Sequence, residues 1–195
     1  YTIHGGTPSY PDCEFSIELR GRWCPPNNLD VIYVGMGYKY LDPDCYQFDL
    51  DTSDPSIVAA VVQQVAEELI RAGIIEALNE ITVNPSGAIP KCGVGAALNV
   101  SLFQSACRKT CFVKPRRPTD GQYWYKIVEL PCGNSCCQSV NEVCIDSVTE
   151  VVKIREIYNN TPTTPCIISG ELPCPFGTEH TIPCRPACAS IQQGG

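Results

Sequence analysis

Apolar and polar residues alternate with a period of two in the first part of the chain, as they do in strands that bury one face. In CEFSIELRGRW, residues 13–23, Phe15 and Ile17 alternate with acidic or hydroxyl side chains. Two further strands are expected after the turn CPPNN, one over residues 29–41 and one over CYQFDLD, residues 45–51. The pattern therefore predicts an antiparallel meander.

A helical period replaces this alternation at Asp54. Asp54 followed by Pro55 supplies a helix N-cap and a proline at the first helical position. Apolar residues then recur at helical spacing, namely Ile57, Val58, Val61, Val62, Val65 and Leu69. The spacing predicts one amphipathic helix from about 55 to 79, in which Gly73 is either a bend or the end of a first section.

Strand patterns return after Ile81 in four short segments rich in β-branched and aromatic residues: AALNVSLFQSAC, GQYWYKIVELPC, SVNEVCIDS and TEVVKIREIY. The last two predict a hairpin that turns around Asp146 to Thr149. The segment that follows is rich in proline and holds four cysteines. Because proline removes a backbone donor, we expect this segment to be neither a central strand nor a helix, but a disulfide-bridged extended chain over the sheets.

These elements predict a β-rich α+β fold, either an antiparallel sandwich or a partly open barrel, covered by one long helix. The β-rich part is expected over residues 1–160. The tail, residues 161–195, is expected to pack on it within one structural unit. A chain of 195 residues can bury roughly 70% of its unfolded surface, so cysteines are not needed merely to make it fold.

The chain nevertheless carries 14 cysteines, beside only two histidines and one methionine. This composition is typical of secreted proteins, in which paired cysteines persist as disulfides. A zinc set of Cys174, His180, Cys184 and Cys188 has permitted spacing, but it leaves the other cysteines unexplained. No C-x-x-C motif lies near a βαβ pattern, which argues against redox catalysis. We expect most or all of them to be bridged: Cys13, Cys24, Cys45, Cys92, Cys107, Cys111, Cys132, Cys136, Cys137, Cys144, Cys166, Cys174, Cys184 and Cys188.

Cys136 and Cys137 are adjacent, so on extended chain their side chains point to opposite faces and bond different partners. We expect one to cross the hairpin, the other to tie the sheet to the tail, and Cys132 to close the turn. The sequence does not select among the roughly 10⁵ possible pairings. Up to seven bridges, each contributing about 2–4 kcal/mol, exceed what ordinary stability requires and indicate durability under extracellular stress.

The net charge of −7 argues against nucleic acids and anionic membranes as main partners. No apolar stretch approaches the length of a membrane span, and a start at Tyr1 rather than Met is expected of a secreted chain after signal-peptide removal. RKTCFVKPRR, residues 108–117, is a local basic exception that includes Arg116 and Arg117. We interpret it as a solvated loop or edge.

Candidate chemistry is sparse. His4 and His180 are the only histidine bases, and neither a G-x-S-x-G elbow nor a carboxylate pair with a telling spacing is present, so we expect no catalytic site and no cofactor. Clustered aspartates are calcium candidates, although they lack the glycine and distal glutamate of an EF-hand loop: Asp42, Asp44, Asp49 and Asp51. Strand ends and a helix cap at Asp54 explain them otherwise. Sequons predict possible N-glycosylation at Asn99 and Asn159.

Two functions remain open. The first is a secreted structural subunit that self-assembles head to tail into an extracellular filament or surface layer, free or attached to a cell. In this hypothesis residues 1–11 donate a strand to the next copy, Tyr1, Ile3 and Tyr10 fill pockets, and Arg116 and Arg117 face an acidic surface. The alternative is a secreted binding module, such as an adhesin, lectin-like or inhibitor domain. Its expected signature is exposed aromatics in QYWYKI, residues 122–127.

Overall fold

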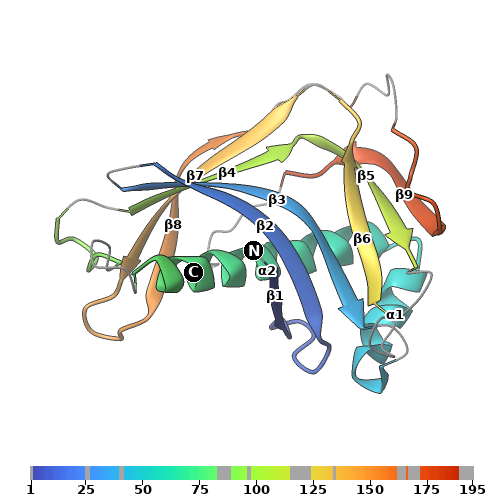
Figure 1. Cartoon of the computed structure of the whole chain (residues 1–195), viewed down its shortest axis with the longest axis horizontal. Helices are drawn as coiled ribbons and strands as arrows, with labels where there is room; N and C mark the ends of the chain where they lie inside the picture. Colours follow the sequence, from blue (N-terminus) through green and yellow to red (C-terminus); the bar gives the residue numbers. More distant parts are fainter. Residues whose placement is uncertain are drawn as a thin grey trace.

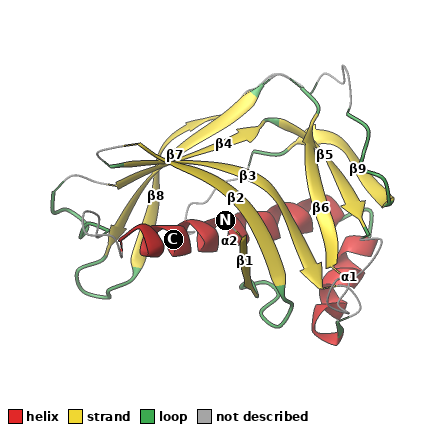
Figure 2. Cartoon of the chain, viewed as in Figure 1, coloured by secondary structure: helices red, strands yellow, loops and turns green. Residues whose placement is uncertain are grey.

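The structure, a computed structural model, describes residues 2–24, 27–39, 42–82, 89–95, 98–114, 124–133, 135–161, 166 and 172–188, without the side chains of residues 2–4 and 79–82. In this part of the chain, one sheet of nine strands curves around a single long helix (Figure 1). The predicted β-rich α+β class is confirmed. The sheet is open, and all the described strands belong to it, so the partly open barrel is nearer to the observed architecture than the two-sheet sandwich (Figure 2).

The strands are β1 (Thr2–Gly5), β2 (Phe15–Cys24), β3 (Asn28–Lys39), β4 (Leu98–Ser105), β5 (Cys107–Val113), β6 (Trp124–Pro131), β7 (Cys136–Ile145), β8 (Val152–Asn160) and β9 (Thr178–Pro186). The helices are the 3₁₀ turn η1 (Pro43–Cys45), α1 (Tyr46–Ser53) and α2 (Val58–Thr82). Helix α2 agrees with the predicted long helix and passes through Gly73 without interruption.

Strand β3 divides the sheet into two branches. One edge of β3 pairs with β2 along residues 28–38. The other edge pairs first with β4, over residues 28–32, and then with β6, over residues 35–39. From this fork the β8 branch continues as β4, β7 and β8, and the β9 branch continues as β6, β5 and β9.

The pairing of β3 with β4 is parallel, so the prediction of a purely antiparallel sheet is wrong at the fork. Parallel neighbours need a crossover connection, and here the chain supplies one through α1 and α2. The two branches are then connected twice. β4 runs through Ala106 into β5, and β6 turns through residues 132–135 into β7.

The predicted third strand, residues 45–51, is wrong. This segment begins as η1, where the Asp42 carboxylate accepts a hydrogen bond from the Asp44 N–H at 3.1 Å, and continues as α1. Its buried residues are Cys45, Phe48 and Thr52, a spacing of three and four that fits a helix. The half-buried aspartates at alternate positions, Asp49 and Asp51, conceal that period in the sequence.

The hydrophobic core lies between α2 and the concave face of the sheet (Figure 1). Helix α2 contributes an apolar stripe to it: Val58, Val62, Val65, Ala66, Leu69, Ile70, Ile74 and Leu78. Phe15 and Ile17 of β2 are fully buried, as the alternation predicts. Phe48 of α1 packs edge-on against Phe15, with ring centroids 4.9 Å apart. The helix therefore closes the concave face of the sheet.

Strands β7 and β8 form the predicted antiparallel hairpin. Asp146 organises its turn, because its carboxylate accepts the N–H groups of Val148 and Thr149, both at 2.9 Å. Lys153 adds an ion pair to the same carboxylate. Glu150 adopts a φ of 57°, the left-handed conformation that such a turn requires.

Candidate functional site

Six disulfides join twelve cysteines of the chain: Cys13–Cys45, Cys92–Cys144, Cys107–Cys166, Cys111–Cys174, Cys132–Cys184 and Cys137–Cys188. The last four connect every cysteine of the tail to β5, to the β6–β7 turn or to the start of β7. Bridging Cys174, Cys184 and Cys188 removes the zinc alternative. The described residues contain no group of three potential metal ligands.

The expectation that most or all cysteines are bridged agrees with these twelve, but Cys24 and Cys136, which it included, form no bridge within the chain. Of the adjacent pair, Cys137 ties the sheet to the tail, as expected for one of the two, whereas Cys136 bonds no partner within the chain. Cys132 reaches Cys184 in β9 instead of closing its own turn. Cys136 lies opposite Ser105 on the outer face of the sheet, whereas Cys137, which bonds Cys188, lies opposite Gln104 on the inner face.

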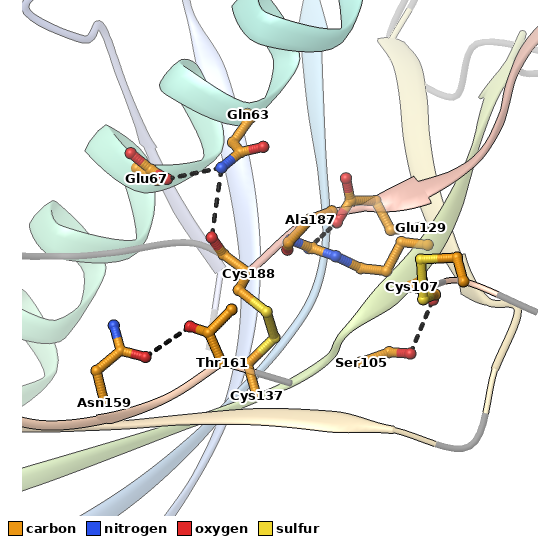
Figure 3. The surroundings of a disulfide bond; sticks show 12 residues. Gln63, Glu67, Ser105, Cys107, Glu129, Cys137, Asn159, Thr161, Ala187 and Cys188 are labelled. Atoms are coloured by element: carbon orange, nitrogen blue, oxygen red, sulfur yellow. Dashed lines mark hydrogen bonds and ion pairs between the residues drawn. A yellow bond between two sulfur atoms is a disulfide. The ribbon is translucent and has the colours of Figure 1, made fainter. Parts of the chain in front are cut away.

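Backbone hydrogen bonds close the fork where the two branches separate. The Cys132 N–H donates to the Cys107 carbonyl at 3.1 Å, and the Ala106 N–H donates to the Ser135 carbonyl at 2.9 Å. The Ala187 N–H donates to the Ala106 carbonyl at 3.1 Å. From α2, Gln63 donates to the Cys188 carbonyl at 3.4 Å, beside the Cys137–Cys188 bridge (Figure 3). These hydrogen bonds hold the start of β5, the β6–β7 turn, the tail and α2 together beside the fork.

A buried ion pair lies beside this closure. The Arg108 guanidinium donates to the Glu129 carboxylate and to the Ala187 carbonyl, and the two side chains are only 6% and 4% exposed. Burial raises the pKa of Glu129 despite the opposing effect of Arg108. The guanidinium carbon of Arg108 also lies 5.8 Å from the centre of the Tyr33 ring, within reach of a cation–π contact. This pair locks the β9 branch to the centre of the sheet.

A second arginine connects the tail to α2. Arg185 of β9 donates to the Thr110 hydroxyl and to the Ala59 carbonyl, each at 3.2 Å. Burial lowers the pKa of its guanidinium. The interpretation of residues 108–117 as a solvated loop or edge is wrong for its first part, because β5 lies between β6 and β9. Arg116 and Arg117 lie outside the described residues.

The N-terminal segment is anchored to its own chain. β1 pairs with β2, and Tyr10 packs against Phe48 with ring centroids 5.2 Å apart. The Tyr10 hydroxyl donates to Asp51 at 2.6 Å, and burial raises its pKa. The assignment of Tyr10 to an arm donated to a neighbour is therefore wrong, because this residue belongs to the protein's own core. Tyr1 and the side chain of Ile3 lie outside the described residues.

The aspartates proposed for calcium have separate structural partners. Asp42 caps η1. Asp49 accepts from the Tyr38 hydroxyl at 2.8 Å, and Asp51 accepts from Tyr10 and from Gln47. The backbone N–H of Asp44 donates to the Asp42 carboxylate, so these two residues form a helix cap. Their spacing in the sequence reflects helix capping and surface contacts.

The two sequons lie on strands of the β8 branch. Asn99 is in β4, where its N–H donates to the Asn27 carbonyl at 2.9 Å. Asn159 is exposed near the end of β8 and accepts a hydrogen bond from the Thr161 hydroxyl at 2.7 Å (Figure 3). Glycosylation at both stays a prediction.

A groove of about 510 Å³ separates β9 from the ends of α1 and α2. It is lined by Thr52, Ser53, Pro55, Val58, His180, Thr181, Ile182 and Pro183. His180 stacks on Phe112 with ring centroids 3.8 Å apart, and burial lowers the pKa of its imidazole. The groove is open and holds no acid–base pair in its lining, so what it offers is a binding surface.

The free edges of the sheet differ in their capacity to accept another strand. β1 has four residues, and β9 contains Pro183 and Pro186, which lack N–H groups. β8 has nine residues and no proline, and it exposes Ile157 and Tyr158 to 51% and 52%. Of the three described strands that end the sheet, β1, β8 and β9, only β8 is both long and free of proline, and the part of β2 that β1 does not cover is shorter than β8. Sequence reasoning missed this asymmetry, because strand order is needed to see which strands are edges.

Comparison with known proteins adds no family to these observations: no protein-family model, no curated protein and no solved structure matches the chain. No helix in the described part of the chain is long and apolar enough to cross a membrane.

Proposed function

We propose that this protein is a secreted structural subunit that joins copies of itself at the β8 edge, forming an extracellular filament or layer, free or attached to a cell. The observation that carries the proposal is the contrast between this edge and the others. β8 offers a row of backbone groups to an incoming strand, whereas β9 is interrupted by prolines and β1 is short.

Side chains on β8 support pairing with a copy of the same chain. Ile157 and Tyr158 supply apolar surface to an added strand. Lys153 and Arg155 lie on the outer face of the first half of β8. There they repel a cationic partner surface and attract an acidic one. The partner surface must be a local acidic one, because two copies of net charge −7 repel each other as wholes.

The disulfides support a place outside the cell, because bridges persist in oxidising compartments and are rare in the cytosol. Six bridges in a chain of this size add more stability than folding requires. Four of them hold the tail, so the β9 side resists unravelling. Such durability suits a structural protein, and the proposal assigns no catalytic role to it.

The test is assembly of the oxidised full chain, measured by sedimentation velocity over a concentration series and by electron microscopy. We expect the wild type to form regular polymers. Ile157→Lys and Tyr158→Lys place a charge on the proposed edge and are expected to abolish polymers while leaving the fold intact. Leu172→Lys is the matched control, because Leu172 is 49% exposed but lies in the tail.

Two outcomes contradict the proposal. One is a wild type that stays monomeric at every concentration. The other is an Ile157→Lys or Tyr158→Lys variant that polymerises as well as Leu172→Lys, since the β8 edge would then be dispensable.

A secreted binding module is the second candidate, and the groove between β9 and α1 favours it. Its volume of about 510 Å³ lies in the range of ligand sites. A screen of extracellular glycans and peptides tests this candidate, with Thr181→Arg as the variant that fills the groove. A ligand that binds the wild type and the variant equally well would exclude the groove as its site.

A further inference from the structure

The two unbridged cysteines lie too far apart to bond within one chain. Cys24 of β2 is opposite Asn28, which is level with Asn99 and Glu142 on the neighbouring strands. Cys136 lies six positions earlier than Glu142 on β7. The two are therefore separated by roughly 20 Å along the strands and roughly 14 Å across them. A disulfide requires Cα atoms within about 7 Å.

No other cysteine is available to either thiol. The two neighbours of Cys136 in the sequence, Cys132 and Cys137, are bonded to Cys184 and Cys188. These bridges also hold the β6–β7 turn on both sides, so the exposed Cys136 is presented from a rigid corner. In an oxidising compartment that bridges twelve cysteines, two remaining thiols indicate a partner outside the chain.

Both thiols lie at stretches of strand edge that no other described strand covers. β1 pairs with β2 only along residues 15–18, and no described strand pairs with the outer edge of β2 from Arg20 to Cys24. β8 pairs with β7 from Gln138 onward, so Cys136 lies just past its end. Each thiol therefore sits where an added strand would run.

The two thiols also share a face. Cys24 lies 3.4 Å from the carboxylate of Asp30 on the outer face of the sheet, and Cys136 is opposite the outward-facing Ser105. Strands that pair edge to edge bring opposite residues of one face to a Cα separation of about 4.5–5.5 Å, which a disulfide can span. A β2 edge of one copy that runs in line with β8 of the next, just past the end of β8 at Asn160, would lie beside Cys136 and satisfy this condition.

The surface beside Cys24 can seat the neighbouring copy. A groove of about 380 Å³ adjoins it on the outer face, lined by Arg20, Gly21, Arg22, Asp30, Ile32 and Phe103. Ile32 is 52% exposed there, an apolar contact surface that the chain itself leaves uncovered.

We infer that Cys24 of one copy forms a disulfide with Cys136 of the next, so that the polymer is covalent and head-to-tail. This inference rests on the proposed self-assembly and specifies its contact. Two different positions bond, so the polymer keeps one free thiol at each of its two ends and can propagate.

The chemistry needs an external disulfide, such as glutathione disulfide, as oxidant. The Cys136 thiolate attacks it to give a mixed disulfide and releases one glutathione thiolate. The Cys24 thiolate of the next copy then attacks the protein sulfur of the mixed disulfide and releases the second. Two protein thiols are oxidised, one glutathione disulfide is reduced to two thiols, and the two protons end on those thiols.

The experiment compares wild type, Cys24→Ser, Cys136→Ser and the double variant in a glutathione redox buffer, by non-reducing electrophoresis and peptide mapping. The wild type should give a ladder of covalent multimers that contains a Cys24–Cys136 peptide. Each single variant alone should lose the ladder and stay monomeric. A mixture of the two single variants should give a dimer band, because each supplies the thiol that the other lacks.

Several results would overturn the inference. Dimers formed by one single variant alone would indicate symmetric bonding, and a monomer with a Cys136–Cys188 peptide would indicate reshuffling within the chain. Sedimentation separates this inference from the proposed function. If wild type and double variant polymerise equally and no ladder forms, the covalent link is wrong and self-assembly stands. If nothing polymerises and no ladder forms, both are wrong.

Discussion

The two branches of the sheet are built with the same kinds of interaction, but they use them differently. The β9 branch buries its Arg108–Glu129 pair, holds the tail with disulfides and ends in a strand with two prolines. The β8 branch exposes its Arg155–Glu142 pair and ends in a strand without proline. Cross-links therefore concentrate on the edge that cannot accept a strand, and the edge that can accept one is held by main-chain pairing.

The largest expected contrast is between the two arginine–glutamate pairs. Arg108→Met removes the ion-pair partner of the buried Glu129 and leaves it only the electrostatic attraction of Arg185, which should lower the free energy of unfolding by about 3–5 kcal/mol. Arg155→Met is the matched control in the β8 branch, where Arg155 is 71% exposed and the loss should be about 0–1 kcal/mol. Urea unfolding of the oxidised proteins measures both.

Glu129→Leu in the Arg108→Met background sharpens this comparison. Removing the buried carboxylate should restore most of the lost stability, because a well-packed apolar pair avoids the cost of burying a charge. Equal losses of unfolding free energy for Arg108→Met and Arg155→Met would show that the two arginine–glutamate pairs contribute equally to stability.

Two disulfides allow a comparison at equal loop length, since Cys132–Cys184 and Cys92–Cys144 each span 52 residues. Serine at both positions of either bridge should lower stability by about 2–4 kcal/mol, because the unfolded chain regains similar freedom. The location of the effect should differ. Hydrogen exchange should rise in β9 for the first variant and in residues 91–95 for the second. Faster exchange of β9 in both would contradict separate roles.

Acid should loosen the β8 hairpin before the β9 branch. Lys153 and two N–H groups hold the pKa of Asp146 well below its usual range, so the stabilisation it gives is present above about pH 4 and is lost as pH falls further. Burial raises the pKa of Glu129, so its protonation favours the folded state, and the stability linked to it is lost as pH rises.

Hydrogen exchange at pH 7 and pH 3, corrected for intrinsic rates, should therefore show lost protection in β7 and β8 but not in β5 and β6. Asp146→Asn should already show the loosened hairpin at pH 7 and should show little further change. Loss of protection in β5 and β6 first would reverse the proposed order.

The elements with strong local signals could be predicted from the sequence. The N-cap at Asp54 and the apolar period identify α2, and the turn at Asp146 identifies the hairpin. Helix α1 was missed because aspartates at alternate positions imitate a strand. Arg108 was assigned to solvent because its basic neighbours conceal that β5 lies inside the sheet.

The fork and the two free thiols could not be predicted, for a different reason. Period two indicates a strand but not its neighbour, so the parallel pairing of β3 with β4 has no local signal. An even number of cysteines indicates pairing but does not say whether all pairs form within one chain. Cys24 and Cys136 differ from the others only in where the folded sheet places them.

The central claim is that assembly uses the β8 edge and not the β9 edge, and amide hydrogen exchange of polymer against monomer tests it most directly. The account predicts slower exchange over residues 152–160 in the polymer, because a neighbouring strand pairs with their N–H groups, and unchanged exchange over residues 178–186. Slower exchange over residues 178–186 with no change over residues 152–160 would contradict it.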